Sequence, residues 1–179
     1  MAVSLTRPLA PEPYAMLPHV ASFDLVSEDV RHGEPLPDSV QAPPGGNASP
    51  QLSWSGFPAQ TRSFLVNVFD PDAPGASGFW HWVLVDVPVT TTSLAHGVGT
   101  PEGNRLPPGA FHVRGDHGLA GYEGAGPPHG DRPHRYYIAV HALDVERLGV
   151  TVGAMPGAVS LAAVRHTLAR GVLMGTAQR

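Results

Sequence analysis

The segment 70–74, Asp-Pro-Asp-Ala-Pro, constrains the fold of this chain more than any other. It follows an apolar, β-rich run at residues 63–69, which predicts a strand. Proline lacks an N–H group and fixes its φ angle, so the two prolines must end that strand. The chain therefore carries two carboxylates, Asp70 and Asp72, on a stiff turn at a strand end. Loops set on a rigid scaffold often carry binding groups.

Two later apolar runs begin with histidine and aromatic residues. Trp80-His81-Trp82 opens a run that continues to residue 87, and His134-Arg135-Tyr136 opens one that continues to residue 143. Both runs predict strands. The end of the first strand and the starts of these two can meet at one end of a sheet. That arrangement would gather two acids and two histidines into one site.

The rest of the chain predicts a mainly β domain with irregular loops. Its 21 glycines and 20 prolines alternate with strand-like runs, including further predicted strands at 20–26 and 51–55. Residues 1–19 are expected to form an irregular arm, and residues 20–179 a single domain. One amphipathic helix is predicted at residues 160–170, with Ser160 as N-cap and Gly171 as its end.

Composition excludes several classes of function. The chain has no cysteine and no lysine, which excludes disulfides, thiol catalysis, lysine nucleophiles and P-loops. A net charge of −4 without a basic patch argues against nucleic-acid binding. No apolar run approaches the roughly 18 residues of a membrane span. Residues 1–13 lack the pattern of a secretion signal, so we expect a soluble cytoplasmic protein.

Two kinds of chemistry fit the predicted cluster. In an anion pocket, the acids would orient His81 and His134 as cationic donors, and Tyr136 and the glycine-rich loop amides at 124–126 would add further donors. In a metal site, the two acids and two histidines would hold zinc or manganese and support ester hydrolysis. The metal site is the less favoured hypothesis, because no His-x-x-x-His or similar ligand spacing is present.

A structural role for each residue is the alternative to both. Asp before Pro commonly starts a turn. For the remaining histidines a structural role is the favoured interpretation: His19, His32, His96, His112, His117, His129, His141 and His166.

Four segments together resemble one known family. They are residues 47–54, 70–74, 80–82 and 126–128, the last leading to His134-Arg135-Tyr136. In sequence, order and spacing they are similar to the phosphatidylethanolamine-binding protein family, in particular its bacterial Raf-kinase-inhibitor-like branch. The resemblance covers roughly residue 21 to the C-terminus.

The resemblance implies an antiparallel β-sandwich with a small anion pocket at one end. In the family this pocket takes phosphate-like groups, including phospholipid head groups. Members act as binding or regulatory proteins rather than enzymes, some inhibit kinases or proteases, and bacterial members often look dimeric. No cofactor or metal is expected. The residues that the resemblance places in the pocket are Asp70, Asp72, His81, His134 and Tyr136, with Pro74, Trp80, Gly126 and Pro127 as walls.

Overall fold

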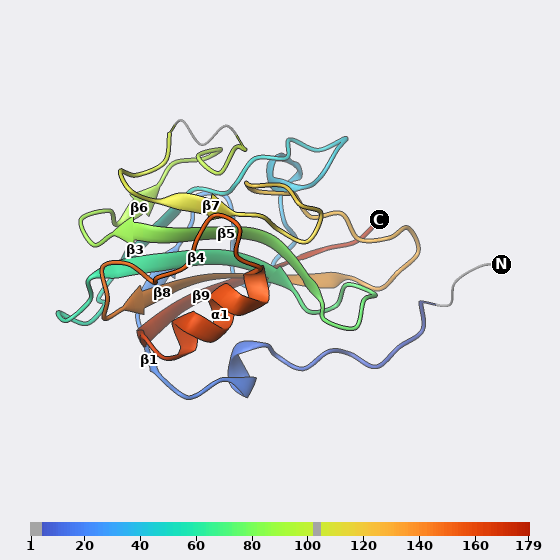
Figure 1. Cartoon of the computed structure of the whole chain (residues 1–179). Coiled ribbons are helices and arrows are strands. Elements are labelled where there is room, and N and C mark those ends of the chain that lie inside the picture. Colours follow the sequence, from blue (N-terminus) through green and yellow to red (C-terminus); the bar gives the residue numbers. More distant parts are fainter. Residues whose placement is uncertain (1–4, 102–104) are drawn as a thin grey trace.

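The computed structural model describes residues 5–101 and 105–179, which form two β-sheets and one α-helix (Figure 1). The larger sheet contains, in spatial order, β1 (Ala21–Ser22), β9 (Thr167–Ala177), β8 (His134–Leu143), β4 (Ser63–Asp70), β5 (Phe79–Pro88) and β7 (Phe111–Val113). The smaller sheet contains β2 (Asp24–Val26), β3 (Leu52–Ser55) and β6 (Ser93–Leu94). The helical elements are η1 (Tyr14–Met16), η2 (Asp38–Val40) and α1 (Pro156–Val164).

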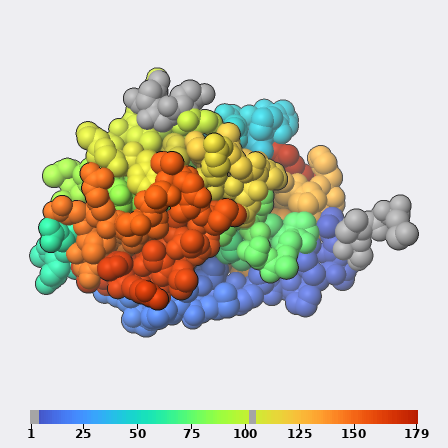
Figure 2. Space-filling model, viewed as in Figure 1, coloured from blue at the N-terminus to red at the C-terminus, as the bar shows by residue number. Residues whose placement is uncertain are grey.

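Strand β4 lies at the centre of the larger sheet, between β8 and β5. Both of its faces are apolar because both are covered. Phe64 and Val66 pack into the core shared with the smaller sheet. Leu65 packs into a second cluster with Val159 of α1. With all atoms drawn, α1 and its flanking segments cover the larger sheet in the view of Figure 2.

The pairing of β4 positions the predicted site. Both neighbours run antiparallel to β4, with Asp70 opposite Phe79 of β5 and Phe69 opposite Tyr137 of β8. The end of β4 therefore lies beside the starts of β5 and β8. The predicted strands at 51–55, 63–69, 80–87 and 134–143 are confirmed. The predicted meeting of the last three at one end of a sheet is confirmed as well.

The predicted helix at 160–170 is wrong in its bounds. Helix α1 begins at Pro156, which suits the first helical turn, and ends at Val164. Ser160 is an interior helix residue, and Gly171 lies inside β9, which pairs with β8 over nearly all its length. Glycine is needed at 171 because a Cβ there would lie 2.9 Å from both Leu25 Cβ and the Phe23 ring.

Two features depart from a purely antiparallel sandwich. Strand β1 pairs with β9 in parallel, so the larger sheet is mixed. The strand predicted at 20–26 is divided at Phe23, and its two halves, β1 and β2, belong to different sheets. The architecture is otherwise the expected β-rich sandwich with one helix.

The N-terminal segment 5–20 is irregular apart from η1 and runs along the sheet. Tyr14 holds it there: its hydroxyl donates to Asn67 Oδ1 at 2.6 Å, and the Arg170 guanidinium lies 4.8 Å from the centre of its ring. Burial lowers the pKa of the adjacent His141 to about 3, so this histidine is a neutral structural group. In the part of the chain that the structure describes, no helix has the length and hydropathy to cross a membrane.

The tight packing of β9 can be tested at Gly171. Alanine there is expected to lower the free energy of unfolding by about 1–3 kcal/mol, because Leu25 and Phe23 leave no room for a Cβ. Gly157→Ala in α1 is the matched control, since its Cβ would meet nothing within 4 Å. Within a helix, alanine is more favourable than glycine by about 0.5–1 kcal/mol. The Gly157→Ala variant should therefore be as stable as wild type or slightly more stable. Urea unfolding measures both, and a Gly171→Ala variant as stable as wild type would contradict this packing.

Candidate ligand-binding site

A cavity of about 480 Å³ opens where β4 ends and where β5 and β8 begin. Its walls combine apolar residues with several titratable side chains. The lining residues are Ala42, Asp70, Ala73, Pro74, Gly75, Gly78, Phe79, His81, His117, Glu123, Gly124, Gly126, Pro127, Pro128, His134, Tyr136 and Arg179.

Seven of the nine residues expected at the site line this cavity: Asp70, Pro74, His81, Gly126, Pro127, His134 and Tyr136. The other two, Asp72 and Trp80, do not line it. Asp72 instead binds the guanidinium of Arg135, with Nε–Oδ2 and Nη2–Oδ1 distances of 2.7 and 2.8 Å. The Trp80 ring lies 4.5 Å from that of Phe69, against the cluster beneath α1. Successive strand residues point to opposite faces, so Trp80 points away when His81 points inward.

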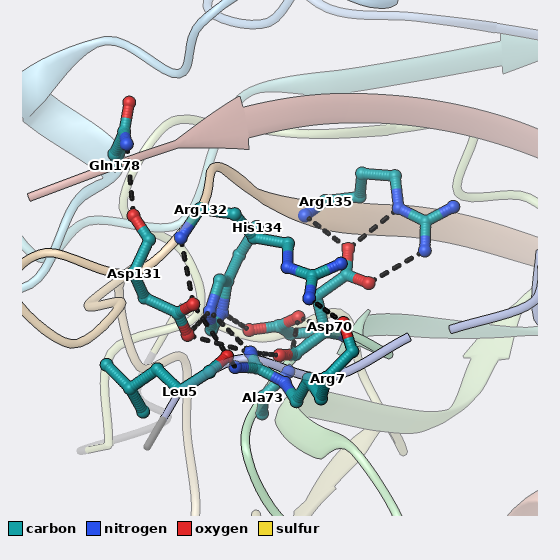
Figure 3. Close-up of polar contacts among 10 residues, drawn as sticks. Leu5, Arg7, Asp70, Ala73, Asp131, Arg132, His134, Arg135 and Gln178 are labelled. Atoms are coloured by element: carbon teal, nitrogen blue, oxygen red, sulfur yellow. Dashed lines mark hydrogen bonds and ion pairs between the residues drawn. The ribbon is translucent and has the colours of Figure 1, made fainter. Parts of the chain in front are cut away.

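His134 is held between two carboxylates (Figure 3). Its Nδ1 lies 2.7 Å from Asp70 Oδ2, and its Nε2 lies 2.9 Å from Asp131 Oδ2. Both ring nitrogens can donate only in the imidazolium form. Burial opposes the charge, but the hydrogen bonds to Asp70 and Asp131 outweigh it and raise the pKa of His134.

The N-terminal segment supplies a second cation to this network. Arg7 bonds Asp131 with Nη1–Oδ1 and Nη2–Oδ2 distances of 3.1 and 2.7 Å, and it also donates to the Asp72 carbonyl. Arg7 Nη2 and His134 Nε2 both donate to Asp131 Oδ2, and the two nitrogens lie 3.2 Å apart. The two cations therefore share one carboxylate. The Arg7 guanidinium holds the pKa of Asp131 well below its usual range. Sequence reasoning missed both Arg7 and Asp131.

Asp70 is fully engaged inside the protein. Its Oδ1 accepts the backbone N–H groups of Asp72 and Ala73 at 2.7 and 3.1 Å, which is the turn that the prolines impose. Its Oδ2 accepts from His134. An acid with both oxygens used in this way orients its histidine.

His81 is in the opposite state from His134. Its Nδ1 donates to the Glu123 carbonyl at 3.0 Å, which leaves Nε2 as the lone-pair nitrogen. Burial lowers the pKa of His81, so the ring is neutral. The expectation that both histidines are cationic is wrong for His81, because the sequence does not reveal how deeply this ring is buried.

Tyr136 brings an unused hydroxyl to the cavity. The residue is 2% exposed; the Gly126 backbone N–H approaches its hydroxyl oxygen, but among the residues that the structure describes none accepts a hydrogen bond from the O–H. Burial raises its pKa, so it stays protonated. Of the loop amides expected to serve as donors, those of Gly124 and Ala125 already bond Asn47 Oδ1 and the Val40 carbonyl. Gly126 lines the cavity.

Three further titratable side chains at the cavity were not predicted as site residues. His117, interpreted from sequence as structural, lies 2.5 Å from Glu123 through Nδ1 and Oε1, and both residues line the cavity. Arg179 lines it from the segment after β9. Nothing in the sequence distinguishes His117 from the seven other histidines that were interpreted as structural. No sequence pattern marks Arg179 as a site residue.

The donor set does not fit a metal site. Among residues 5–101 and 105–179, no group of three or more histidine, aspartate or glutamate side chains is arranged to hold a metal ion. Both nitrogens of His134 already face carboxylates, and Asp72 is bound to Arg135. The hydrolase alternative therefore gains no support.

The different surroundings of His134 and His81 predict that an NMR titration finds their pKa values shifted in opposite directions. We expect His134 above 6.5 and His81 below it. The stability that His134 gains is then full below about pH 6.5 and is lost as pH rises through its folded pKa. Asp131→Asn should lower the His134 pKa, whereas Asp144→Asn, at an exposed pair with His166, should leave it unchanged. A His134 pKa below 6.5 in wild type would contradict the two-carboxylate arrangement.

Comparisons with known proteins identify the family. The sequence profile described as Phosphatidylethanolamine-binding protein matches residues 26–178. YbcL of Escherichia coli is 43% identical over 158 residues, covering 82% of this chain and 86% of YbcL. YbhB of the same organism is 44% identical over 149 residues, covering 81% of this chain and 93% of YbhB.

A solved structure agrees with the sequence comparisons. The crystal structure of E. coli YbcL, described as a new member of the mammalian PEBP family, superposes with a TM-score of 0.86 at 39% identity. That match covers 89% of this chain and 99% of the YbcL chain. Membership of this family supports a binding or regulatory protein in general. The chain belongs to the phosphatidylethanolamine-binding protein family.

Proposed function

We propose that this protein binds a small phosphate-like anion in the cavity, either free or as the head group of a phospholipid. The observation that carries the proposal is the buried Tyr136 hydroxyl, whose O–H has no acceptor among the described residues. Leaving such a group unsatisfied costs about 1–3 kcal/mol, so buried hydroxyls are normally hydrogen-bonded. A ligand oxygen beside Tyr136 would remove this cost.

His81 supports the same class of ligand. Its neutral Nε2 is an acceptor at the cavity, and it can accept from the P–OH group that a phosphate monoester keeps below its second pKa near 6. The ring centres of His81 and Tyr136 are 5.1 Å apart, close enough for both side chains to contact one phosphate group. Tyr136 would donate to one oxygen while His81 accepts from another.

A binding role fits the cavity better than catalysis. Its described lining residues include no serine, threonine, cysteine or lysine to act as a nucleophile. Both ring nitrogens of His134 are hydrogen-bonded to carboxylates of the protein, so this histidine is not free to take a proton from a ligand. We therefore propose a non-enzymatic protein that binds or senses its ligand. A kinase or protease partner, a homodimer and a cytoplasmic location stay predictions from the sequence.

Calorimetric titration with inorganic phosphate and phosphoethanolamine tests this function. We expect saturable binding to the wild type and roughly 10–100-fold weaker binding to Tyr136→Phe, the loss of one hydrogen bond to a charged group. Tyr137→Phe is the matched control, because the neighbouring side chain points to the other face of β8 and contacts Arg135. It should bind as wild type does.

Two results would count against the proposal. Tyr136→Phe could bind as tightly as Tyr137→Phe, which would separate the anion from this cavity. Alternatively, the wild type could show no saturable heat with either compound.

A further inference from the structure

The cations closest to the cavity are already neutralised by carboxylates. His134 lies between Asp70 and Asp131, and Arg7 shares Asp131 with it. Arg135 is bonded to Asp72. His81 is uncharged because burial lowers its pKa. None of these groups offers an uncompensated positive charge to an anion.

Arg179 differs from all of them. Its Nη2 donates to the carbonyl oxygens of Ala42 and Pro43 at 2.5 and 3.1 Å. These acceptors are neutral, so they orient the guanidinium without cancelling its charge. Among the described residues that line the cavity, it is the one guanidinium, and it forms no ion pair with a described carboxylate.

Arg179 and Tyr136 belong to the wall of the same cavity. A Cβ built on Gly126 would lie 3.6 Å from Arg179 Nη1, and Gly126 and Tyr136 both line the cavity. The positive charge also acts on Tyr136, where it favours the ionised form against the larger effect of burial. The main chain of Arg179 is anchored as well, since the Gly130 N–H donates to its main-chain oxygen at 2.9 Å.

We propose that Arg179 is the specificity-determining residue of the cavity and supplies the positive charge that selects an anion. His81 and Tyr136 then contribute uncharged hydrogen bonds, and the buried His134 network contributes shape. This inference rests on the proposed function, since it names the group that recognises the charge of the phosphate-like ligand. A fixed guanidinium suits phosphate oxygens, which it can contact through more than one N–H group.

Titration of the full chain with inorganic phosphate at low and high salt tests this role. Arg179→Gln should weaken binding about tenfold or more at low salt, and Arg179→Lys, which keeps the charge but not the forked N–H contacts, should recover part of the affinity. The loss in Arg179→Gln should shrink at high salt, because salt screens the charge that the variant lacks. Arg165→Gln is the matched control: it removes the same charge from an exposed position at the end of α1 and should bind as wild type does.

The outcomes separate this inference from the proposed function. If wild type binds phosphate and Arg179→Gln binds equally well, the role of Arg179 is refuted and the pocket stands. If the loss in Arg179→Gln does not change with salt, the residue acts through packing and the charge proposal is refuted. If the wild type does not bind phosphate, both proposals fail.

Discussion

The buried imidazolium of His134 between two carboxylates is the interaction on which this end of the molecule depends. His134, Asp70 and Asp131 are at most 3% exposed, so each charge must find its partner inside the protein. The three come from the start of β8, the end of β4 and the loop before β8. Removing one member of such a buried pair leaves an uncompensated charge, at a cost of about 3–5 kcal/mol. The network therefore fixes the wall of the cavity.

This network divides the polar groups into two sets. Asp70, Asp131, His134 and Arg7 satisfy one another, and Arg7 thereby ties the N-terminal segment to the end of the sheet. Groups with free capacity are different residues: the Tyr136 hydroxyl, the His81 lone pair and the Arg179 guanidinium. We infer that the first set builds the pocket and the second set contacts the ligand. The acid–histidine pattern in the sequence thus marks the place of the site more than its contacts.

Much of this arrangement could be predicted because its signals are local. The prolines at 71 and 74 end β4, and the apolar runs after residues 80 and 134 define its two neighbours, so their meeting point follows. The strand β9 could not be predicted in this way. Leu161 and Val164 lie in α1, and Leu168 continues their helical spacing although it belongs to β9; Gly171 resembles a helix end. Only the close approach of Phe23 and Leu25 explains that glycine.

The charge states of the site residues also could not be predicted from local sequence patterns. Arg7 contacts Asp131 across 124 positions, and Arg179 reaches Ala42 across 137, without any periodic signal in the sequence. His81 and His134 look equivalent as histidines at strand starts. The pKa of His81 is lowered because its ring is buried and bonds only a neutral carbonyl. The pKa of His134 is raised because its ring bonds two carboxylates. Burial and partners are properties of the fold, which the sequence pattern does not contain.

The most direct test of this account is the response of the two histidine side chains to phosphate, followed by nitrogen NMR. The account predicts that the ring nitrogens of His81 shift with saturable phosphate binding, while those of His134 keep their doubly protonated signature. A shift at His134 with no change at His81 would contradict it, because the buried imidazolium would then be the group that contacts the ligand.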